Sequence, residues 1–512
     1  MRPYLYSILI FVLLASGMAC RKNFEYAPSA GNLEFSKDTV YLDTIFSNIG
    51  SSTYSLKVYN PTRDDVEIPS IRLQNGTQSG YRLNVDGVPG KEFQNIPILA
   101  QDSMFIFIET TFHVSPHTVN ELLYTDKLLF DVDTDEQSVE LVTLVKDAVF
   151  LFPNKDSEGK IETISIGNDS EGNSIKVDGF SLQDNQLHFT NEKPYVIYGY
   201  AAVSNEKTLL IDAGARVHFH KDSGIYIDAG AKLMINGSLS SDSKLLENEV
   251  IFEGDRLEPQ FESISGQWGA LLITNGSTGN TINYLTIKNA TVGLKIQDEL
   301  NNNSTSENTN LEIKNSQIYN SENINLWAQS ASILAENLVL GAAGSQSLYC
   351  NMGGAYNFSH CTIANYWIKD FRLSTALQID NFSNDKSYDL FNADFTNCII
   401  YGAQSREISL VSNETNTFNF SFTNCLIRYA DNAVSTDSFV LDFDNENHFK
   451  NNIINQPPEF FDSFGGDYRI NELSSANGTA NLETALEIPL DIRGVNRNVN
   501  PDIGAFESTL QE

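Results

Sequence analysis

Short runs of hydrophobic residues, separated by polar turn residues, make up most of this 512-residue chain. From residue 33 to residue 150 these runs have strand length, and none has the spacing of an amphipathic helix. The expected strands are Tyr54–Tyr59, Ile68–Leu73, Met104–Phe112, Lys127–Val132 and Val139–Val145. Turn pairs such as Asn75-Gly76 and Asp86-Gly87 lie between them. The pattern predicts an antiparallel β-sandwich.

Two nearly identical segments follow each other closely farther along the chain. Residues 211–215 read Ile-Asp-Ala-Gly-Ala, and residues 227–231 repeat these five letters at an offset of 16 residues. This offset is too short for two parallel strands joined by a crossover helix. We therefore expect a coil that places similar strands directly on top of one another.

A longer repeat continues toward the C-terminus. Its template is an apolar residue, any residue, Asn, two further residues and a second apolar residue. Its copies are Ile287/Asn289/Val292, Ile313/Asn315/Ile318, Ala335/Asn337/Leu340, Phe358/His360/Ile363, Phe395/Asn397/Ile400, Phe422/Asn424/Ile427 and Phe449/Asn451/Ile454. The central positions lie 22 to 37 residues apart, which is typical of a solenoid. The leucine-rich template is missing, so we predict an all-β chain with a right-handed parallel β-helix after the sandwich.

Stacked coils would bring equivalent repeat positions to within about 4.8 Å of one another. Asn adopts a left-handed backbone at a tight turn at little cost, and stacked Asn amides can hydrogen-bond along the axis. The expected structural ladder is Asn289, Asn315, Asn337, Asn397, Asn424 and Asn451. The expected interior aromatic stack is Phe358, Phe395, Phe422 and Phe449. Cys361, Cys398 and Cys425 share one position, where we expect small buried thiols.

The N-terminus has the features of an export signal. Arg2 precedes an apolar run at residues 8–14, which is too short to span a bilayer. Residues 17–20, Gly-Met-Ala-Cys, resemble the lipobox of bacterial lipoproteins, although Leu is more common at position 17. The resemblance implies that Cys20 is lipidated and anchors the chain to a membrane, at the bacterial outer membrane or cell surface. The alternative is an ordinary signal peptide cleaved near Ala19.

The net charge of −33 excludes some classes of partner. Nucleic-acid binding relies on Lys and Arg, so we expect no nucleic-acid partner. Docking on anionic lipid headgroups is unfavourable for the same reason. Four cysteines after Cys20 are too few for a disulfide scaffold, and no Cys/His cluster has zinc spacing. We therefore expect no metal and no cofactor.

Several motifs carry a family resemblance. Residues 194–199 and 266–271 resemble the first strand and the Trp-Gly rung of pectin-lyase-like β-helix proteins. Residues 491–494 and 500–507 resemble the C-terminal motif of secreted β-helix proteins with varied anchors. Residues 54–60 and 104–108 resemble immunoglobulin-like modules of bacterial surface proteins. The resemblance to β-helix proteins covers about three fifths of the chain, and it implies fold and surface location rather than a reaction.

These patterns together predict six segments. They are a lipoprotein signal peptide at 1–19, a tether at 20–30, an immunoglobulin-like sandwich at 31–150, a linker and β-helix cap at 151–190, the β-helix at 191–480 and a closing segment at 481–512.

No catalytic residues can be assigned from the sequence. Hydrolases with this fold use clustered acids, but the only Asp-Asp pair, Asp64-Asp65, lies in the predicted sandwich. The calcium-binding and Arg motifs of pectate-lyase-like enzymes are also missing. We expect a non-catalytic protein that binds glycan or matrix or acts as a spacer. The alternative is a polysaccharide lyase or glycoside hydrolase with a divergent site.

The best candidate for a binding site is the long interval from His360 to Asn397, which exceeds its neighbours by about ten residues and should protrude. Aromatic rings beside charged groups are typical of sugar-binding grooves. The candidate binding residues are Tyr366, Trp367, Lys369, Asp370 and Arg372, with Tyr401 and Arg428 as a cation–π pair on neighbouring coils. The alternative is a solvated loop packed on the coil edge. His218 and His220 lie on one strand face and are interpreted as two rung histidines.

Overall fold

The computed structural model describes residues 26–29, 31–112, 121–131, 136–168, 172–299, 309–384, 386–413, 415–430 and 441–509. The predicted signal peptide and Cys20 lie outside the described residues. The chain forms two compact units, Met1–Lys146 and Asp147–Glu512, each considered by itself below. No helix in the described part is both long enough and apolar enough to cross a membrane.

The N-terminal unit is an immunoglobulin-like sandwich of two sheets. One sheet contains β1 (Ala27–Pro28), β5 (Val66–Leu73), β10 (Glu121–Asp131), β11 (Gln137–Lys146), β3 (Thr39–Phe46) and β8 (Glu92–Ile98). The other contains β2 (Glu34–Phe35), β4 (Tyr54–Tyr59), β9 (Ser103–Thr110), β6 (Tyr81–Val85) and β7 (Val88–Gly90). Alternate residues, such as Val139 and Leu141 of β11, point into the core between the sheets.

The second unit is a parallel β-helix with three long sheets, named I, II and III here. Sheet I contains β12 (Val149–Leu151), β16 (Tyr195–Ile197), β19 (Arg216–Phe219), β22 (Val250–Gly254), β25 (Leu285–Lys288), β28 (Gln317–Ser321), β31 (Val339–Ala343), β34 (Thr362–Asn365), β39 (Ile399–Gly402), β42 (Leu426–Ile427) and β44 (Ile453–Ile454). Sheet II contains β13 (Thr163–Asn168), β14 (Ser174–Ser181), β17 (Tyr200–Val203), β20 (Gly224–Ile227), β23 (Trp268–Ile273), β26 (Ala290–Gln297), β29 (Ile324–Gln329), β32 (Leu348–Asn351), β35 (Leu377–Asp380) and β40 (Ile408–Val411). Sheet III contains β15 (His188–Phe189), β18 (Thr208–Asp212), β21 (Lys232–Asn236), β24 (Asn280–Asn283), β27 (Leu311–Lys314), β30 (Ser332–Glu336), β33 (Gly354–Ser359), β38 (Leu390–Thr396), β41 (Ser421–Thr423) and β43 (Phe449–Lys450).

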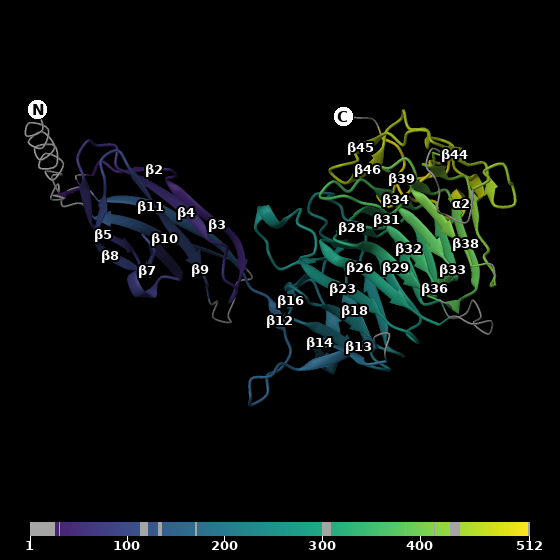
Figure 1. The fold of residues 1–512 in the computed structure, drawn as a ribbon, viewed down its shortest axis with the longest axis horizontal. Helices are drawn as coiled ribbons and strands as arrows, with labels where there is room; N and C mark the ends of the chain where they lie inside the picture. Colours follow the sequence, from purple (N-terminus) through teal and green to yellow (C-terminus); the bar gives the residue numbers. More distant parts are fainter. Residues whose placement is uncertain are drawn as a thin grey trace, which may run out of the picture. The chain divides into compact units, whose positions relative to one another are not determined.

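Each coil passes from sheet III to sheet I and then to sheet II, and each strand pairs in parallel with its equivalent in the next coil (Figure 1). The antiparallel β13–β14 hairpin is the exception within these three sheets. Together with the N-terminal sandwich, this architecture confirms the predicted fold class, an all-β chain with a right-handed parallel β-helix. Each predicted strand of the sandwich overlaps an observed one, with the largest difference at β10, which begins at Glu121 rather than at Lys127.

The interior of the solenoid is apolar and stacked in register. The rings of Phe358, Phe395, Phe422 and Phe449 form one column. Successive centroids lie 5.0, 4.9 and 5.5 Å apart, and the rings are tilted by no more than 11°. Offset stacking of this kind adds to the free energy that burial contributes. The described cysteines, Cys350, Cys361, Cys398 and Cys425, are buried free thiols.

The turn from sheet III to sheet I holds one residue with positive φ in each repeat. This column, named the turn column here, contains Tyr284, Asn315, Asn337, His360, Asn397, Asn424 and Asn451. The copy predicted at Ile287/Asn289/Val292 is wrong, because Ile287 pairs with Ile318 rather than with Ile313. Asn289 also has positive φ, but it lies at the next corner, where the amide of Asn320 donates to it.

The predicted axial hydrogen bonds form in only part of the turn column. The Nδ2 of Asn337 donates to Oδ1 of Asn315 at 2.9 Å. Asn424 lacks the axial hydrogen bonds expected of a ladder residue. Its Nδ2 donates to the carbonyl of Thr479 at 3.0 Å, and its buried Oδ1 has no partner in the described structure. The chain that follows the last coil therefore binds amides that would otherwise face the neighbouring coils.

Both ends of the predicted β-helix differ from the structure. The unit boundary lies at Lys146/Asp147 rather than at residue 150, because β12 pairs with β16 of sheet I. The residues predicted as a linker and cap form strands β13 to β15 and the first coil. The last solenoid strand ends at Ile454 rather than near residue 480. The chain then forms the hairpin β45 (Phe460–Asp462) and β46 (Asp467–Ile470) and the short helix α2 (Leu482–Glu487).

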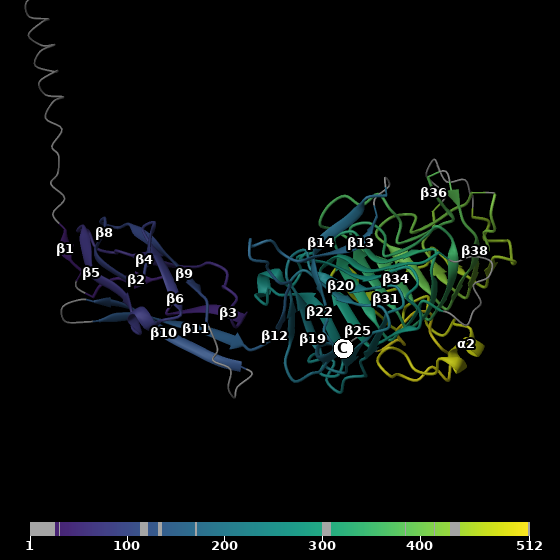
Figure 2. The same cartoon turned by 90° about the horizontal axis from the view of Figure 1, so that it is seen from below.

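The closing segment, residues 456–509, folds back along the later coils, where Figure 2 shows it in yellow. Its Arg497 is fully buried and donates to Oδ1 of Asn337 at 2.9 Å. Its Gly504 donates from the backbone to the carbonyl of Asn397 at 2.8 Å. The segment is thus held to several coils at once, and its hairpin takes part in the site described next.

Candidate functional site

Two long loops leave the solenoid at the corner where the chain passes from sheet I to sheet II. Most crossings at this corner are short, such as residues 198–199 between β16 and β17. Two are long, namely residues 255–267 between β22 and β23 and residues 366–376 between β34 and β35. They are named loop 255–267 and loop 366–376 here. Both loops line the same space beside the stacked strands.

A groove of about 530 Å³ lies between these two loops and the hairpin of the closing segment, and it is named the aromatic groove here. Its aromatic lining consists of Tyr319, Tyr366, Trp367, Phe464 and Tyr468. Its polar lining includes Glu262, Lys288, Asn289, Asn320 and Lys369. Three chain segments that are far apart in the sequence therefore build one site, and this combination of rings and convergent polar groups is typical of a ligand site.

Three of the predicted binding residues line the groove: Tyr366, Trp367 and Lys369. The indole nitrogen of Trp367 donates to Oδ1 of Asp370 at 2.5 Å, which holds the ring in place. The amine of Lys369 lies 5.1 Å from the Trp367 ring centroid. It also donates to the carbonyl of Ser263 and, at 2.6 Å, to Oδ1 of Asn320. Lys369 therefore ties loop 366–376 to loop 255–267 and fixes the groove wall.

Arg372 is not available to a ligand, which corrects its assignment as a binding residue. Its guanidinium forms two hydrogen bonds to Glu407, of 2.9 and 2.6 Å, and both side chains are almost completely buried. Burial raises the pKa of Glu407, while Arg372 favours its charged form. The pair anchors the base of loop 366–376 to the next coil, so Arg372 has a structural role.

Tyr401 and Arg428 lie farther along the outer face of sheet I and do not line the groove. The Arg428 guanidinium carbon lies 5.6 Å from the Tyr401 ring centroid, which is the geometry of a cation–π contact. The pair therefore packs on the coil surface outside the groove and does not belong to this site.

Charged residues on the sheet I side of the groove are already paired. Lys288 and Glu253 form an ion pair of 2.7 Å, and Nδ1 of His218 lies 3.7 Å from Glu253. Burial favours the neutral form of Glu253, but His218 and Lys288 outweigh it and lower the pKa of this carboxyl. Burial likewise opposes the charge of Lys288, and Glu253 outweighs it and raises the pKa of the amine. Neither group is suited to donate or accept a proton near neutral pH.

Glu262 is the only carboxylate among the residues that line the groove, all of which the structure describes. Glycoside hydrolysis needs two carboxyl groups placed on either side of the scissile bond. Across the described residues, no group of three His, Cys, Asp or Glu side chains converges in a way that could hold a metal ion. Among the described residues, the groove lining therefore contains neither a pair of carboxylates nor a metal-binding group.

Sequence reasoning missed Lys288, Tyr319, Phe464 and Tyr468. Lys288 and Tyr319 lie next to each other on adjacent strands of sheet I. The repeat template does not pair them, because it aligns Asn289 with Asn315 and so places this coil in the wrong register. Phe464 and Tyr468 reach the groove because the closing segment folds back. The sequence did contain one indication of loop 255–267, because these residues interrupt the repeat just before the Trp268-Gly269 rung.

Comparisons with known proteins identify no family. No protein-family model matches the chain, and no curated protein matches it. Solved structures with local similarity include a family 123 glycoside hydrolase from Clostridium perfringens, with 8% identity over 24% of this chain and 31% of that one, at a TM-score of 0.17. The major pilin subunit BcpA of Bacillus cereus shows 12% identity over 28% of this chain and 52% of that one, at 0.15.

The catalytic domain of a family 87 α-1,3-glucanase, solved with tetrasaccharides, shows 9% identity over 84% of this chain and 95% of that one, at a TM-score of 0.20. This chain spans about a third of the family 123 enzyme and half of the pilin. At these TM-scores none of the three similarities bears on function.

Proposed function

We propose that this protein is an exported, lipid-anchored surface protein that binds a polysaccharide in the aromatic groove without cleaving it. The observation that carries the proposal is the groove itself, in which rings from three chain segments surround hydroxyl, amide and amine groups. Sugar rings pack their apolar faces on aromatic side chains and direct their hydroxyls to such polar groups.

The polar groups of the groove suit hydroxyl ligands. No hydrogen bond is recorded for the phenol oxygens of Tyr319 and Tyr366 within the described structure, so both can donate to and accept from a sugar. Lys369 crosses the groove wall, and its position is fixed by Asn320. A site whose side chains are already held in place loses little conformational entropy when a ligand binds.

Binding without cleavage is favoured by the charges in the groove. Glu262 is the single carboxylate among the described residues that line the groove, and Lys288 is paired with Glu253. The second candidate is a polysaccharide lyase or glycoside hydrolase with a divergent site. Release of reducing ends or unsaturated products from a bound polysaccharide would favour that candidate over the first.

The membrane anchor rests on the lipobox-like residues 17–20 and on the resemblance to secreted β-helix proteins of the pectin-lyase-like superfamily. Cys20→Ala should move the protein from the membrane fraction to the soluble fraction. A Cys425→Ala variant, which changes a buried thiol of the solenoid, is the matched control and should stay with the membrane. Retention of Cys20→Ala in the membrane fraction would exclude the anchor.

Binding can be tested on a glycan array with two matched pairs of variants. Trp367→Ala and Lys369→Ala alter the groove, whereas Trp327→Ala and Lys295→Ala alter the same residue types on sheet II, where the Lys295 amine lies 4.3 Å from the Trp327 ring centroid. We expect the groove variants to lose the array signal and the sheet II variants to keep it. An array on which the wild-type protein binds no glycan would refute the proposed function.

A further inference from the structure

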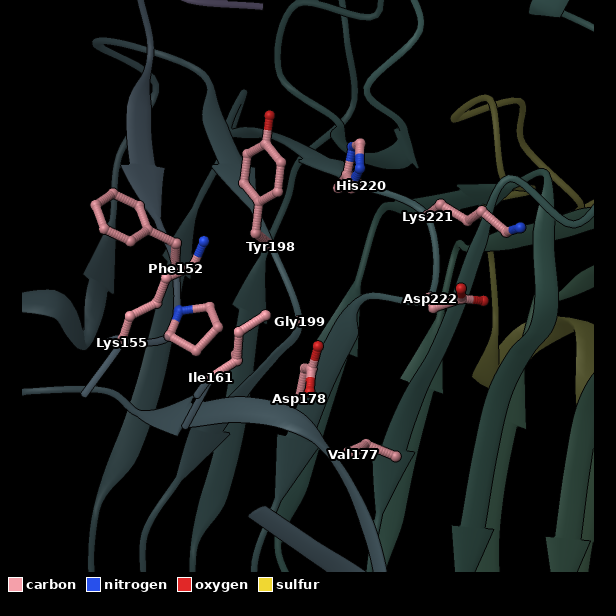
Figure 3. A pocket seen from close by; sticks show the side chains of 11 residues that line it. Phe152, Lys155, Ile161, Val177, Asp178, Tyr198, Gly199, His220, Lys221 and Asp222 are labelled. Carbon is pink, nitrogen blue, oxygen red and sulfur yellow. The ribbon is translucent and has the colours of Figure 1, made fainter. Parts of the chain in front are cut away.

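A second pocket, named the N-terminal pocket here, lies at the start of the solenoid and has a volume of about 660 Å³ (Figure 3). One part of its lining is apolar and comes from Phe152, Pro153, Ile161 and Val177. Figure 3 shows the rings of Phe152, Tyr198 and His220 along one side, with Val177 and Asp178 opposite them. The pocket is large enough for a ligand that presents one apolar face.

His220 is held in a fixed orientation at the wall of this pocket. Its Nδ1 lies 2.8 Å from Oδ2 of the buried Asp255, and its ring stacks on Tyr198 with centroids 4.5 Å apart. The hydrogen bond to Asp255 raises the pKa of His220, and burial partly opposes this shift. Because Nδ1 is engaged, Nε2 is the ring nitrogen that remains for a ligand.

The remaining polar groups of the pocket include both signs of charge. Lys155, Lys221, Asp178 and Asp222 are among the residues that line the pocket, and none of them forms an ion pair with another described residue. A ligand that carries only one sign of charge would leave one of these sets unmatched. A hydroxyl group donates to a carboxylate and accepts from an ammonium, so a sugar ring matches both sets at once.

The pocket and the aromatic groove lie along the same corner of the solenoid. Strand pairing places His218 beside Glu253 and Lys288 beside Tyr319 on the outer face of sheet I. His220 follows this face two coils before Lys288, which corresponds to about 10 Å along the axis. Loop 255–267 leaves the corner between the two sites, and it supplies Asp255 to the pocket side and Glu262 to the groove.

We propose that the N-terminal pocket binds a sugar ring of the same polysaccharide chain whose neighbouring residues occupy the aromatic groove. This inference rests on the proposed function and adds a second binding site to it. A chain that spans both sites binds the second one intramolecularly, so its affinity exceeds that of a short oligosaccharide by a large factor. A disaccharide, which fills one site only, gains nothing from the second.

The test compares a disaccharide, a hexasaccharide and the intact polymer of the polysaccharide with the strongest array signal. His220→Ala and Tyr198→Ala alter the pocket, and His188→Ala is the matched control because its Nε2 also lies 2.8 Å from an aspartate, Asp212, at an exposed site outside both pockets. Melting temperatures establish that each variant is folded. Calorimetry then gives the affinity for each chain length.

We expect the pocket variants to lose about a hundredfold in affinity for the polymer, while the disaccharide bound in the groove is unaffected. His188→Ala should match the wild type at every length. Equal polymer affinity for the wild type and His220→Ala would overturn the second site and leave groove binding intact. Trp367→Ala should lose disaccharide binding, because the disaccharide occupies the groove. His220→Ala should keep disaccharide binding, because it alters only the N-terminal pocket.

Discussion

Arg497 donates a hydrogen bond from Nε to Nδ1 of His360 at 3.1 Å, although 137 residues of sequence separate them. His360 occupies the turn column, between Asn337 and Asn397. The same guanidinium reaches Oδ1 of Asn337 and lies 3.2 Å from Glu507 of the closing segment. One buried side chain therefore connects two consecutive coils to the segment that covers them, and its partners should show large effects when they are altered.

Asn337→Ala should lower the stability of the solenoid by about 3–5 kcal/mol. The substitution removes the bonds that Asn337 makes to Asn315 and to the carbonyl of Leu490, and it leaves the buried Arg497 without one acceptor. It also places Ala at a φ of 50°. Asn337→Gly should recover about 1–2 kcal/mol of this loss, because Gly tolerates that backbone. Denaturant unfolding measures both values.

Asn424→Ala is the matched comparison within the turn column. This variant loses one side-chain hydrogen bond, to the carbonyl of Thr479. It also places Ala at a positive φ, which Asn adopts at lower cost. We expect a cost of about 2–3 kcal/mol, less than for Asn337→Ala. Equal costs for the two variants would mean that Arg497 contributes nothing through Asn337.

The carboxyl of Glu507 should make the protein less stable as the pH rises. Burial, with a contribution from Asp502, raises the pKa of Glu507 to about 7, despite the opposing effect of Arg497. Between its ordinary pKa and this value the folded state binds more protons than the unfolded state, so the free energy of unfolding falls with rising pH. The full change is on the order of 3 kcal/mol.

Glu507→Gln should remove that pH dependence. At about pH 3.5, below the ordinary pKa of Glu, the variant and the wild type should melt together, since Glu507 is then mostly protonated in both the folded and the unfolded state. At about pH 8 the variant should melt higher. A variant that melts well below the wild type at about pH 8 would show instead that the Glu507–Arg497 ion pair stabilises the fold.

Arg372→Ala tests the structural role given to this residue. The variant leaves the buried Glu407 without its partner, and breaking a buried pair on one side costs about 3–5 kcal/mol. Lys207→Ala, which breaks the exposed pair with Asp184, should cost less than about 1 kcal/mol. Glycan affinity of the folded Arg372→Ala protein should stay close to that of the wild type. Selective loss of affinity at full stability would restore Arg372 as a binding residue.

The buried cysteines should be unreactive in the native state. Burial raises the pKa of Cys350 and of Cys398 well above the ordinary thiol value, so the reactive thiolate is scarce. A thiol-specific chromogenic reagent should modify Cys350, Cys361, Cys398 and Cys425 only after denaturant is added. Rapid modification of the native protein at these positions would indicate that the coils open locally.

The stacking order could be derived from the sequence because equivalent positions repeat the same chemistry. Phe358, Phe395 and Phe422 are each followed two residues later by an Asn or His. In the structure these Phe residues pair on adjacent strands, and the Asn and His residues share the turn column. The predicted alignment fails near Asn289. In that coil Tyr284 occupies the turn column, whereas Asn289, five residues later, matches the repeat template at a different corner. A single sequence offers no means to distinguish two corners that carry similar local motifs.

Loop 366–376 was located by its excess length, which requires no knowledge of its partners. The separation of its side chains into binding and structural groups depends on contacts with other coils. Arg372 is removed from the site by Glu407, 35 residues later in the chain, and Lys369 is fixed by Ser263, 106 residues earlier. Such pairings follow from stacking of particular coils, and the local sequence does not determine them.

The closing segment also determines when the aromatic groove is complete during synthesis. A chain that ended after Ile454 would contain every strand of the three sheets, yet it would lack Phe464, Tyr468 and Arg497. Such a fragment would be a rod of stacked coils with one wall of its groove missing. Synthesis of the residues after Ile454 therefore completes the groove, and a chain interrupted before them lacks one groove wall however well its coils have folded.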